Sequence, residues 1–250
     1  MFKKAILTTS IILFSTHTVA FDIKGAIKNS GADLLKAGTL SEKDVIKESR
    51  SAVKFLDSDN TVNPESAQSS KRLDKLVKRI KLPEIEGVKF NFKVYQTEPG
   101  NLNAFATPDG SIRFHSALMD AMTDDQVLAI IGHEIGHVVE KHSFKQMRKS
   151  LLSSAAIRGA AGQSAAGSAA YNIGGGDLAQ KFVNASFSRS DEISADKYAL
   201  KILNEAGAKP EAMLEAIEVL KAQFGNGGGM LSSHPSNNRR IKSLRKAMAK

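Results

Sequence analysis

The sequence predicts an α+β fold that is mostly helical, with one small sheet beside a buried helix. Apolar residues recur at helical spacing through most of the chain, and only short stretches alternate as strands do. The helix expected over 123–139 is apolar on nearly all sides, so it belongs in the centre of the fold. With 42% hydrophobic residues among 250, the chain can form a sizeable core.

The cysteine count excludes several kinds of site. The chain has no cysteine, which rules out disulfides, thiolate zinc fingers, iron–sulfur clusters and a cysteine nucleophile. We therefore also expect no lipid anchor on an N-terminal cysteine. Any bound metal must take its side-chain ligands from histidines and carboxylates.

The first twenty residues have the layout of a cleavable secretory signal peptide. A basic start is followed by an apolar run over 5–14 and a small polar region, with Thr18 and Ala20 at the positions that signal peptidase requires. The apolar run is about half of the ~20 residues that a bilayer span needs. We therefore expect cleavage after Ala20 and export, rather than a permanent membrane anchor.

The chain is basic, with 35 Lys and Arg against 26 Asp and Glu and a formal net charge of +9. This balance predicts attraction to anionic surfaces such as membrane headgroups, so peripheral membrane association is one expectation. Export argues against nucleic acid as a partner. The positive residues are spread along the chain, which favours the plainer interpretation of solvated helix faces and a basic tail.

Helices are predicted on the N-terminal side of the sheet. Residues 21–58 have apolar residues at helical spacing, and a helix-start motif begins at Ser41 inside this stretch. Asn63 and Pro64 fit an N-cap followed by proline in the first helical turn. We expect them to open a helix that ends at Pro83.

Two regions predict the sheet. Residues 88–94 alternate apolar and polar side chains, as expected of a half-buried strand. Residues 104–107 and 111–115 flank a Pro-Asp-Gly sequence that is typical of a hairpin turn. A capping box that starts at Thr123 then opens the buried helix.

Small residues and glycines mark the C-terminal half. Residues 153–176 are mostly Ala, Ser and Gly, and we expect a helix followed by a flexible loop at 174–176, with a mobile flap as the alternative. Further helices are expected around 190–203 and from Pro210 onward. A glycine run at 225–229 then leads to a short basic end.

The buried helix carries His133-Glu134-Ile135-Gly136-His137, a His-Glu-x-x-His pattern. Four helical residues bring the two imidazoles to within ~40° of one another, about one turn apart, so both can bind one Zn²⁺. The glutamate beside the first histidine can act as general base on a water at the metal. Such polar residues on an otherwise apolar segment need a reason, because unpaired buried charge is costly.

A catalytic zinc site needs a third protein ligand. His142 lies ~140° round from His137 and cannot join the site if the helix continues, and His115 falls on the hairpin strand, where we expect an exposed or structural role. Glu192 and Asp196 are four residues apart and share a helix face. One can bind metal while the other holds a ligand histidine by its second nitrogen, although spacing alone leaves open that both are solvent-facing partners of nearby cations.

Two of these motifs resemble a known family. The His-Glu-x-x-His stretch at 133–137 is followed by Ser-Arg-Ser-Asp-Glu-Ile-Ser-Ala-Asp at 188–196. Together they resemble the zinc metallopeptidase family of the CAAX prenyl proteases and HtpX, which is gluzincin-like. The resemblance implies a zincin-type metallopeptidase fold with the small sheet beside the active-site helix. It also implies one Zn²⁺ per chain on the two motif histidines and Glu192, with Asp196 as their support.

An edge strand extends the likeness. Asn103, Ala104 and Phe105 look like the strand of this family that lies beside bound peptide. The resemblance implies that they bind substrate through the backbone, which makes side-chain selectivity weak.

A C-terminal motif completes the likeness, which runs over about residues 94–244. His234 before Pro235, with Arg240 after them, looks like the family's His-Pro motif. A developing oxyanion needs a donor besides zinc, and His234 or Arg240 is the candidate. His234 in the open zinc position of a resting state is the alternative.

The closest likeness is to soluble or lipid-anchored periplasmic members of the family. The lipid-anchored members carry an anchoring cysteine that this chain lacks, so we expect release into the periplasm. The transmembrane helices of the prenyl-protease and HtpX branches are missing, which argues against prenyl-protein substrates. We expect residues 1–20 to form the signal peptide and 21–250 a single peptidase domain, with a helical part over 21–82 and a zinc peptidase core over 83–250.

The expected function is a zinc-dependent metalloendopeptidase that cleaves unfolded or misfolded envelope and outer-membrane proteins in the periplasm, for protein quality control. Only flexible chain can lie along an edge strand, which favours unfolded protein or peptide as the substrate. A periplasmic chaperone or assembly factor that rarely cuts is the first alternative. A basic binding module with a structural zinc is the second, but Glu134 speaks against it because such a site needs no base. The oligomeric state stays open.

Overall fold

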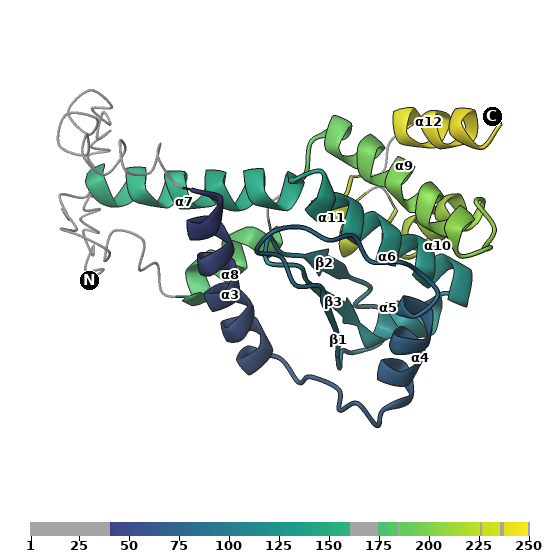
Figure 1. Cartoon of the computed structure of the whole chain (residues 1–250), viewed down its shortest axis with the longest axis horizontal. Helices are drawn as coiled ribbons and strands as arrows, with labels where there is room; N and C mark the ends of the chain where they lie inside the picture. Colours follow the sequence, from purple (N-terminus) through teal and green to yellow (C-terminus); the bar gives the residue numbers. More distant parts are fainter. Residues whose placement is uncertain (1–40, 161–174, 185, 226, 236–237, 250) are drawn as a thin grey trace, which may run out of the picture.

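The computed structural model describes residues 41–160, 175–184, 186–225, 227–235 and 238–249. In this part of the chain, helices surround one three-stranded sheet (Figure 1), so the predicted mostly helical α+β fold is confirmed. The expected signal peptide and the helical spacing before Ser41 lie outside the described residues. None of the described helices is long and apolar enough to span a membrane.

The first described helix begins where the sequence predicts. Helix α3 (Glu42–Asp59) starts after Ser41, whose hydroxyl accepts a hydrogen bond from the third helical residue in a full capping box. The prediction for the next helix was wrong at both ends, because α4 spans Gln68–Val77 rather than opening at Pro64 and ending at Pro83. The backbone N–H of Asn63 donates to the carbonyl of Val94 instead (2.8 Å), which ties this segment to the edge of the sheet.

The sheet has the strand order β1-β3-β2. Strand β1 (Asn91–Tyr95) pairs in parallel with β3 (Ser111–His115), and β2 (Ala104–Ala106) pairs with β3 antiparallel, which confirms the hairpin. Gly110 in the turn has φ 88°, and a Cβ there would come within 2.9 Å of the backbone of Lys89.

Strand β1 starts later than the alternating pattern predicts. It begins at Asn91 instead of at residue 88. The N–H of Lys89 donates to the carbonyl of Asp109 (3.0 Å), so the segment before β1 bonds to the hairpin turn rather than to β3 itself.

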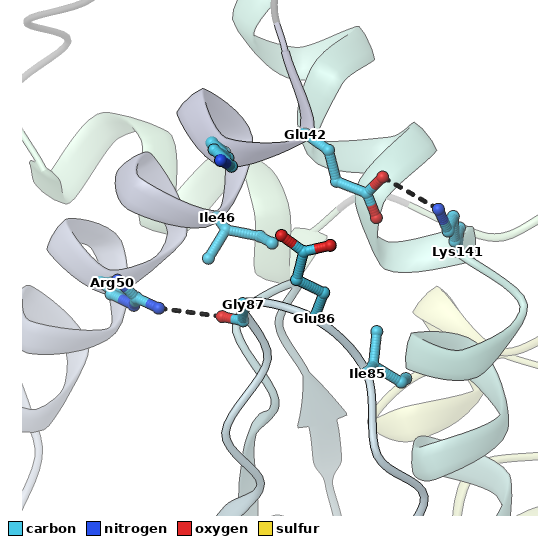
Figure 2. A pocket seen from close by; sticks show the side chains of 8 residues that line it. Glu42, Ile46, Arg50, Ile85, Glu86, Gly87 and Lys141 are labelled. Carbon is cyan, nitrogen blue, oxygen red and sulfur yellow. Dashed lines mark hydrogen bonds and ion pairs between the residues drawn. The ribbon is translucent and has the colours of Figure 1, made fainter.

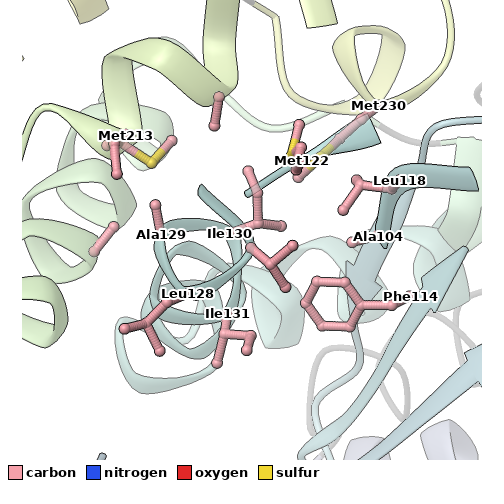
Figure 3. Close-up of a cluster of buried hydrophobic side chains, with 14 of the residues drawn as sticks. Ala104, Phe114, Leu118, Met122, Leu128, Ala129, Ile130, Ile131, Met213 and Met230 are labelled. Atoms are coloured by element: carbon pink, nitrogen blue, oxygen red, sulfur yellow. The ribbon is translucent and has the colours of Figure 1, made fainter. Parts of the chain in front are cut away.

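The central helix lies against one face of this sheet. Helix α5 (Ser116–Ala121) leads into α6 (Asp124–Val139), which opens with the predicted capping box at Thr123 and is buried along nearly its whole length. Figure 3 shows the apolar cluster around α6, where Ile130 and Ile131 lie near Phe114 of β3. Sheet residues that belong to this cluster are Val94, Ala104, Ala106, Ile112 and Phe114.

Three helices, which we call the cap layer, lie on the other side of the sheet: α3, α7 (His142–Ala160) and α8 (Gly175–Asn184). They contact one another (Figure 1) and share a second apolar cluster with the sheet. The buried residues of this cluster are Val45, Ala52, Leu56, Tyr95, Phe105, Met147, Leu151 and Ala179. Because side chains alternate along a strand, the two clusters take opposite faces of the same strands.

The expectation of a flexible glycine loop at 174–176 is wrong for two of the three residues. Gly175 and Gly176 lie in α8, and residues 161–174 fall outside the described part. A Cβ on Gly176 would come 2.8 Å from the ring of Phe55. Glycine there permits close packing of α8 on α3, which composition alone could not distinguish from a loop.

The C-terminal helices return to the central helix. Helix α9 (Arg189–Glu205) matches the prediction, while α10 (Ala212–Phe224) begins two residues after Pro210. A short α11 (Met230–Ser233) follows. The expected short basic end is instead a helix, α12 (Asn238–Met248), which packs on α9 and buries Leu244.

Candidate metal centre

Small residues bring helices α6 and α9 into close contact. A Cβ on Gly132 would lie 3.0 Å from the Cα of Ala199, and one on Gly136 would lie 3.1 Å from the Cα of Ala195. Residues four apart lie on one helix face, so the two glycines and the two alanines form matching flat stripes. The motif residues of the two helices therefore meet across a short distance.

Four buried donor atoms face one another between these helices and α11: His133 Nε2, His137 Nε2, Glu192 Oε1 and His234 Nδ1. The two Nε2 atoms of the motif histidines are 3.1 Å apart. Glu192 Oε1 lies 3.3 Å from His137 Nε2 and 3.1 Å from His234 Nδ1. His234 Nδ1 is also 3.2 Å from His133 Nε2.

This arrangement fits zinc. Nitrogen and oxygen ligands bind tetrahedral zinc at about 2.0–2.1 Å, which places neighbouring ligand atoms ~3.3 Å apart. Burial holds the pKa of His137 well below its usual range. Burial alone would raise the pKa of Glu192, but the guanidinium of Arg240 together with the neighbouring His234 and His137 outweighs it and keeps that pKa well below normal. Neutral imidazole and ionised carboxylate are the forms that bind a metal.

Glu134 is fully buried beside this group. Neither of its carboxylate oxygens has a hydrogen-bond partner among the described residues, and His234 Nε2 is 3.6 Å from Oε1. Burial raises the pKa of Glu134, although the neighbouring positive groups oppose the shift. A raised pKa suits a carboxylate that must take up a proton and release it again.

A buried carboxylate and guanidinium lie behind the donor atoms. Asp196 Oδ1 is 3.0 Å from Nδ1 of His133, the nitrogen that faces away from the donor group. Arg240 donates two hydrogen bonds to Asp196 at 2.8 and 2.7 Å, a third to the carbonyl of His234 at 3.2 Å, and forms an ion pair with Glu192. Burial alone would raise the pKa of Asp196, but Arg240 and the hydrogen bond from His133 together outweigh it and lower that pKa.

Two aromatic rings contact His137 at the site. The sequence excluded His142 as a zinc ligand, and His142 is indeed absent from the donor group, but its contact with His137 was not foreseen. His142 is buried with its Nδ1 3.2 Å from Nδ1 of His137, because α6 ends at Val139 and a new helix starts. The condition under which spacing excluded His142 from the site, a continuous helix, is not met. The ring of Phe187 stacks on that of His137 at 3.8 Å and 23°, and no spacing in the sequence indicated it.

The predicted substrate strand β2 is an outer strand of the sheet, and its three residues are buried. The carbonyl oxygen of Asn103 accepts from the N–H of His115, and the N–H of Thr107 donates to the carbonyl of Ser111. Because backbone groups alternate in direction along a strand, those of Ala104 and Ala106 point to the opposite edge of β2. The Asn103 side chain accepts from the N–H of Ala104 (3.0 Å), and the Phe105 ring enters the cap-layer cluster. This edge lies toward α6 and α11 in Figure 1.

His115 has the structural role expected of it. Its Nδ1 lies 3.1 Å from the backbone carbonyl of Asn101, and its ring packs 6.4 Å from that of Tyr95. It is absent from the donor group.

The central helix with its two histidines, the acid from the neighbouring helix and the small flanking sheet define a zinc metalloendopeptidase. Residues 65–248 match peptidase family M48, and the chain belongs to this family. It is 33% identical over 254 residues to the metalloprotease LoiP of Escherichia coli, covering 99% of this chain and 97% of that protein. It is 32% identical over 247 residues to the metalloprotease YcaL of the same species, covering 98% of this chain and 96% of that protein. A more distant relative is the putative beta-barrel assembly-enhancing protease of Vibrio cholerae, 30% identical over 166 residues, 62% of this chain and 34% of that protein.

Proposed function

We propose that this metalloendopeptidase cuts unfolded or misfolded envelope and outer-membrane proteins in the periplasm, as part of protein quality control. The observation that carries the proposal is the buried group of four donor atoms with the carboxylate of Glu134 beside it, which accepts no hydrogen bond from the described residues. His133, His137 and Glu192 are the proposed zinc ligands, and one Zn²⁺ is bound per chain. Bound zinc supplies a positive charge that polarises a peptide carbonyl and acidifies a water molecule.

Glu134 has the proposed role of general base and then general acid. Its carboxylate takes a proton from the attacking water and delivers it to the leaving amine nitrogen. The lack of any hydrogen bond to either oxygen leaves both available for this transfer. Its position next to His133 in α6 fixes the carboxylate beside the donor group, so little reorganisation is needed.

His234 and Arg240 receive different roles within this proposal. His234 Nδ1 belongs to the donor group, which supports a resting state in which His234 holds the fourth position and a peptide displaces it. Arg240 directs its donors at Asp196, Glu192 and the carbonyl of His234, which supports a positioning role rather than contact with an oxyanion. We expect His234→Ala to lower the KM for peptide, because no side chain then competes; a lower kcat with an unchanged KM would favour the oxyanion role instead.

The substrate class follows from the free edge of β2. The carbonyl of Ala104 and the backbone groups of Ala106 face away from β3 and would pair with an extended peptide, while the N–H of Ala104 is bonded to the Asn103 side chain. A folded protein has no free extended segment to offer, which favours unfolded chains. The name of the Vibrio cholerae relative, a beta-barrel assembly-enhancing protease, agrees with substrates among outer-membrane proteins.

The periplasmic location is proposed from the sequence of residues 1–20. We propose that the signal peptide is removed after Ala20 and that 21–250 forms one peptidase domain, with a helical part over 21–82 and the zinc peptidase core over 83–250. N-terminal sequencing of the exported protein tests the cleavage site, and an intact Met1 would contradict it. Peripheral contact with anionic headgroups stays an expectation from the net charge of +9.

The decisive experiment is Glu134→Gln. We expect zinc content and thermal unfolding to match the unaltered protein, while cleavage of unfolded casein falls by about 10²–10⁴-fold. Full activity in this variant would refute the role of Glu134. If the variant loses cleavage but still rescues an envelope defect, the chain acts mainly as a chaperone and the proteolytic role is secondary.

A further inference from the structure

We infer that His142 is the positioning residue for His137, and that it fixes the second zinc ligand as Asp196 fixes the first. The inference rests on the proposed metal site. It concerns the nitrogen of His137 that faces away from the donor group, a polar atom that requires an acceptor when the other nitrogen binds a metal.

The geometry around His137 defines one hydrogen-bond direction. With Nε2 in the donor group, the hydrogen of the neutral ring lies on Nδ1. Nδ1 of His142 is 3.2 Å away, with the ring centroids 5.2 Å apart at 70°. His142 must therefore accept at Nδ1 and carry its own hydrogen on Nε2.

Partners from helix α9 match this tautomer. Nε2 of His142 is 3.2 Å from the hydroxyl oxygen of Ser194 and 3.4 Å from a carboxylate oxygen of Asp191. Both can accept the hydrogen, so the two imidazoles donate in one direction, from His137 to His142 to α9. His142 is only 5% exposed, so water competes little for these bonds.

The end of the central helix makes this contact geometrically available. Helix α6 closes with the N–H of Lys141 donating to the carbonyl of Val138, and Lys141 then takes φ 56°, the one non-glycine positive φ in the described chain. This left-handed residue interrupts the helix and makes His142 the first residue of α7. A continuous helix would place the ring ~140° away.

A contact from the cap layer braces this left-handed residue. Lys141 Nζ forms an ion pair with Glu42 of α3 at 2.9 Å, across a cavity of about 550 Å³ that is also lined by Ile46 and Ile85 (Figure 2). Both side chains are about half exposed, so the pair contributes little energy by itself. The ion pair does show that α3 contacts the junction of α6 and α7 at Lys141, the residue whose conformation sets the position of His142.

A matched pair of variants tests the inference. His142→Leu and His142→Gln are similar in volume, but only glutamine has an oxygen to accept from His137 and an N–H to donate to α9. We expect His142→Leu to weaken zinc binding by about 10- to 100-fold, measured by competition with a chromophoric chelator at fixed pH. His142→Gln should stay within a few fold of the unaltered protein, and His115→Leu, which removes a half-buried imidazole elsewhere, should leave zinc affinity unchanged.

The outcomes separate this inference from the proposed function. If the unaltered protein binds no zinc, the metal site fails; if it binds zinc and a folded His142→Leu protein binds it equally well, only the role of His142 fails. Equal losses in the leucine and glutamine variants would also overturn the role. Should neither variant fold, ¹⁵N-histidine NMR of the zinc-loaded unaltered protein decides: a hydrogen-bonded, slowly exchanging Nδ1 proton on His137 is expected, and a rapidly exchanging one refutes the inference.

Discussion

Two arginine–aspartate pairs with buried arginines join elements of this protein, one at the metal centre and one between the cap layer and the sheet. Arg240 donates to both oxygens of Asp196 at 2.8 and 2.7 Å, and Arg113 donates to both oxygens of Asp57 at 2.8 and 3.0 Å. Both arginine side chains are 2% exposed. The pairs have the same two-pronged geometry, so their surroundings decide what each one does.

At the metal centre, each member of the pair touches a proposed zinc ligand. Asp196 approaches His133 at 3.0 Å, and Arg240 pairs with Glu192 and with the carbonyl of His234. A change in either partner must therefore alter the position or charge of a donor atom. Both stability and metal binding therefore depend on this network.

In the second network, the aspartate joins three groups that have no contact with the donor atoms in the described chain. Asp57 of α3 accepts from the hydroxyl of Tyr95 (2.8 Å) and from Lys93 (2.7 Å) as well as from Arg113. A further hydrogen bond joins Arg113 to the side chain of Asn91 (2.9 Å). These contacts attach α3 to β1 and β3, so the network fixes the cap layer on the sheet.

The difference shows that a buried ion pair has no function of its own. The Arg240–Asp196 pair holds the proposed zinc ligands in position, and the Arg113–Asp57 pair attaches the cap layer to the sheet. The comparison therefore predicts that substitutions in the first network change metal affinity together with stability, while those in the second change stability alone.

The largest effect is expected from Arg240→Met. Removing this guanidinium leaves Asp196 and Glu192 buried without their cation, which costs about 3–5 kcal/mol of unfolding free energy. The two carboxylates would protonate or rearrange, so zinc should be lost during purification. Urea unfolding and metal content measure both effects, and a stable variant with full zinc would contradict the proposed coupling.

A smaller loss is expected from Asp57→Asn. The amide keeps some hydrogen bonds but leaves Arg113, buried at 1% exposure, without its anion. Because Asp57 itself is partly exposed, we expect a loss near the lower end of the range for a broken buried pair, about 2–3 kcal/mol. Zinc affinity and kcat of the folded variant should equal those of the unaltered protein. A tenfold loss of zinc affinity would show that the cap layer controls the metal site and would end the distinction between the networks.

The matched change at the metal centre is Asp196→Asn. The amide oxygen can still accept from His133, but the negative charge that makes this ligand a stronger donor is removed. We expect zinc affinity to fall by about 10- to 100-fold in chelator competition. Arg240 keeps Glu192 as a partner, so unfolding of the metal-free protein should change less than it does in Asp57→Asn.

Local spacing could predict the two residue pairs of the metal centre, and the family resemblance implied that Glu192 joins the two histidines. His133 and His137 are one helical turn apart, as are Glu192 and Asp196, and helical periodicity alone places each pair on one face. Gly132 and Gly136, which are four residues apart in α6, were a further local signal of close helix packing.

The second network could not be predicted in this way. Asp57 and Arg113 are 56 residues apart on elements whose pairing depends on tertiary structure. The late start of α4 has the same origin, because the N–H of Asn63 bonds to a strand that is distant in sequence. The contact of His142 with His137 was missed for a local reason instead: helical spacing assumes a continuous helix, and the left-handed conformation of Lys141 ends it.

Acid provides the last and mildest way to separate the two networks. Burial alone would raise the pKa of Asp57, but hydrogen bonds from Arg113, Lys93 and Tyr95 outweigh it and lower that pKa. A carboxyl whose folded pKa is lowered contributes stability above its unfolded value of about 3.9, and this stability is lost as the pH falls toward the folded pKa. The difference in unfolding free energy between the unaltered protein and Asp57→Asn should thus be constant from pH 7 to pH 5 and shrink below pH ~4. Because both proteins share the metal centre, its own acid dependence cancels in this difference. A difference that persists unchanged at pH 3 would mean that shape and packing, rather than the charge of Asp57, hold α3 on the sheet.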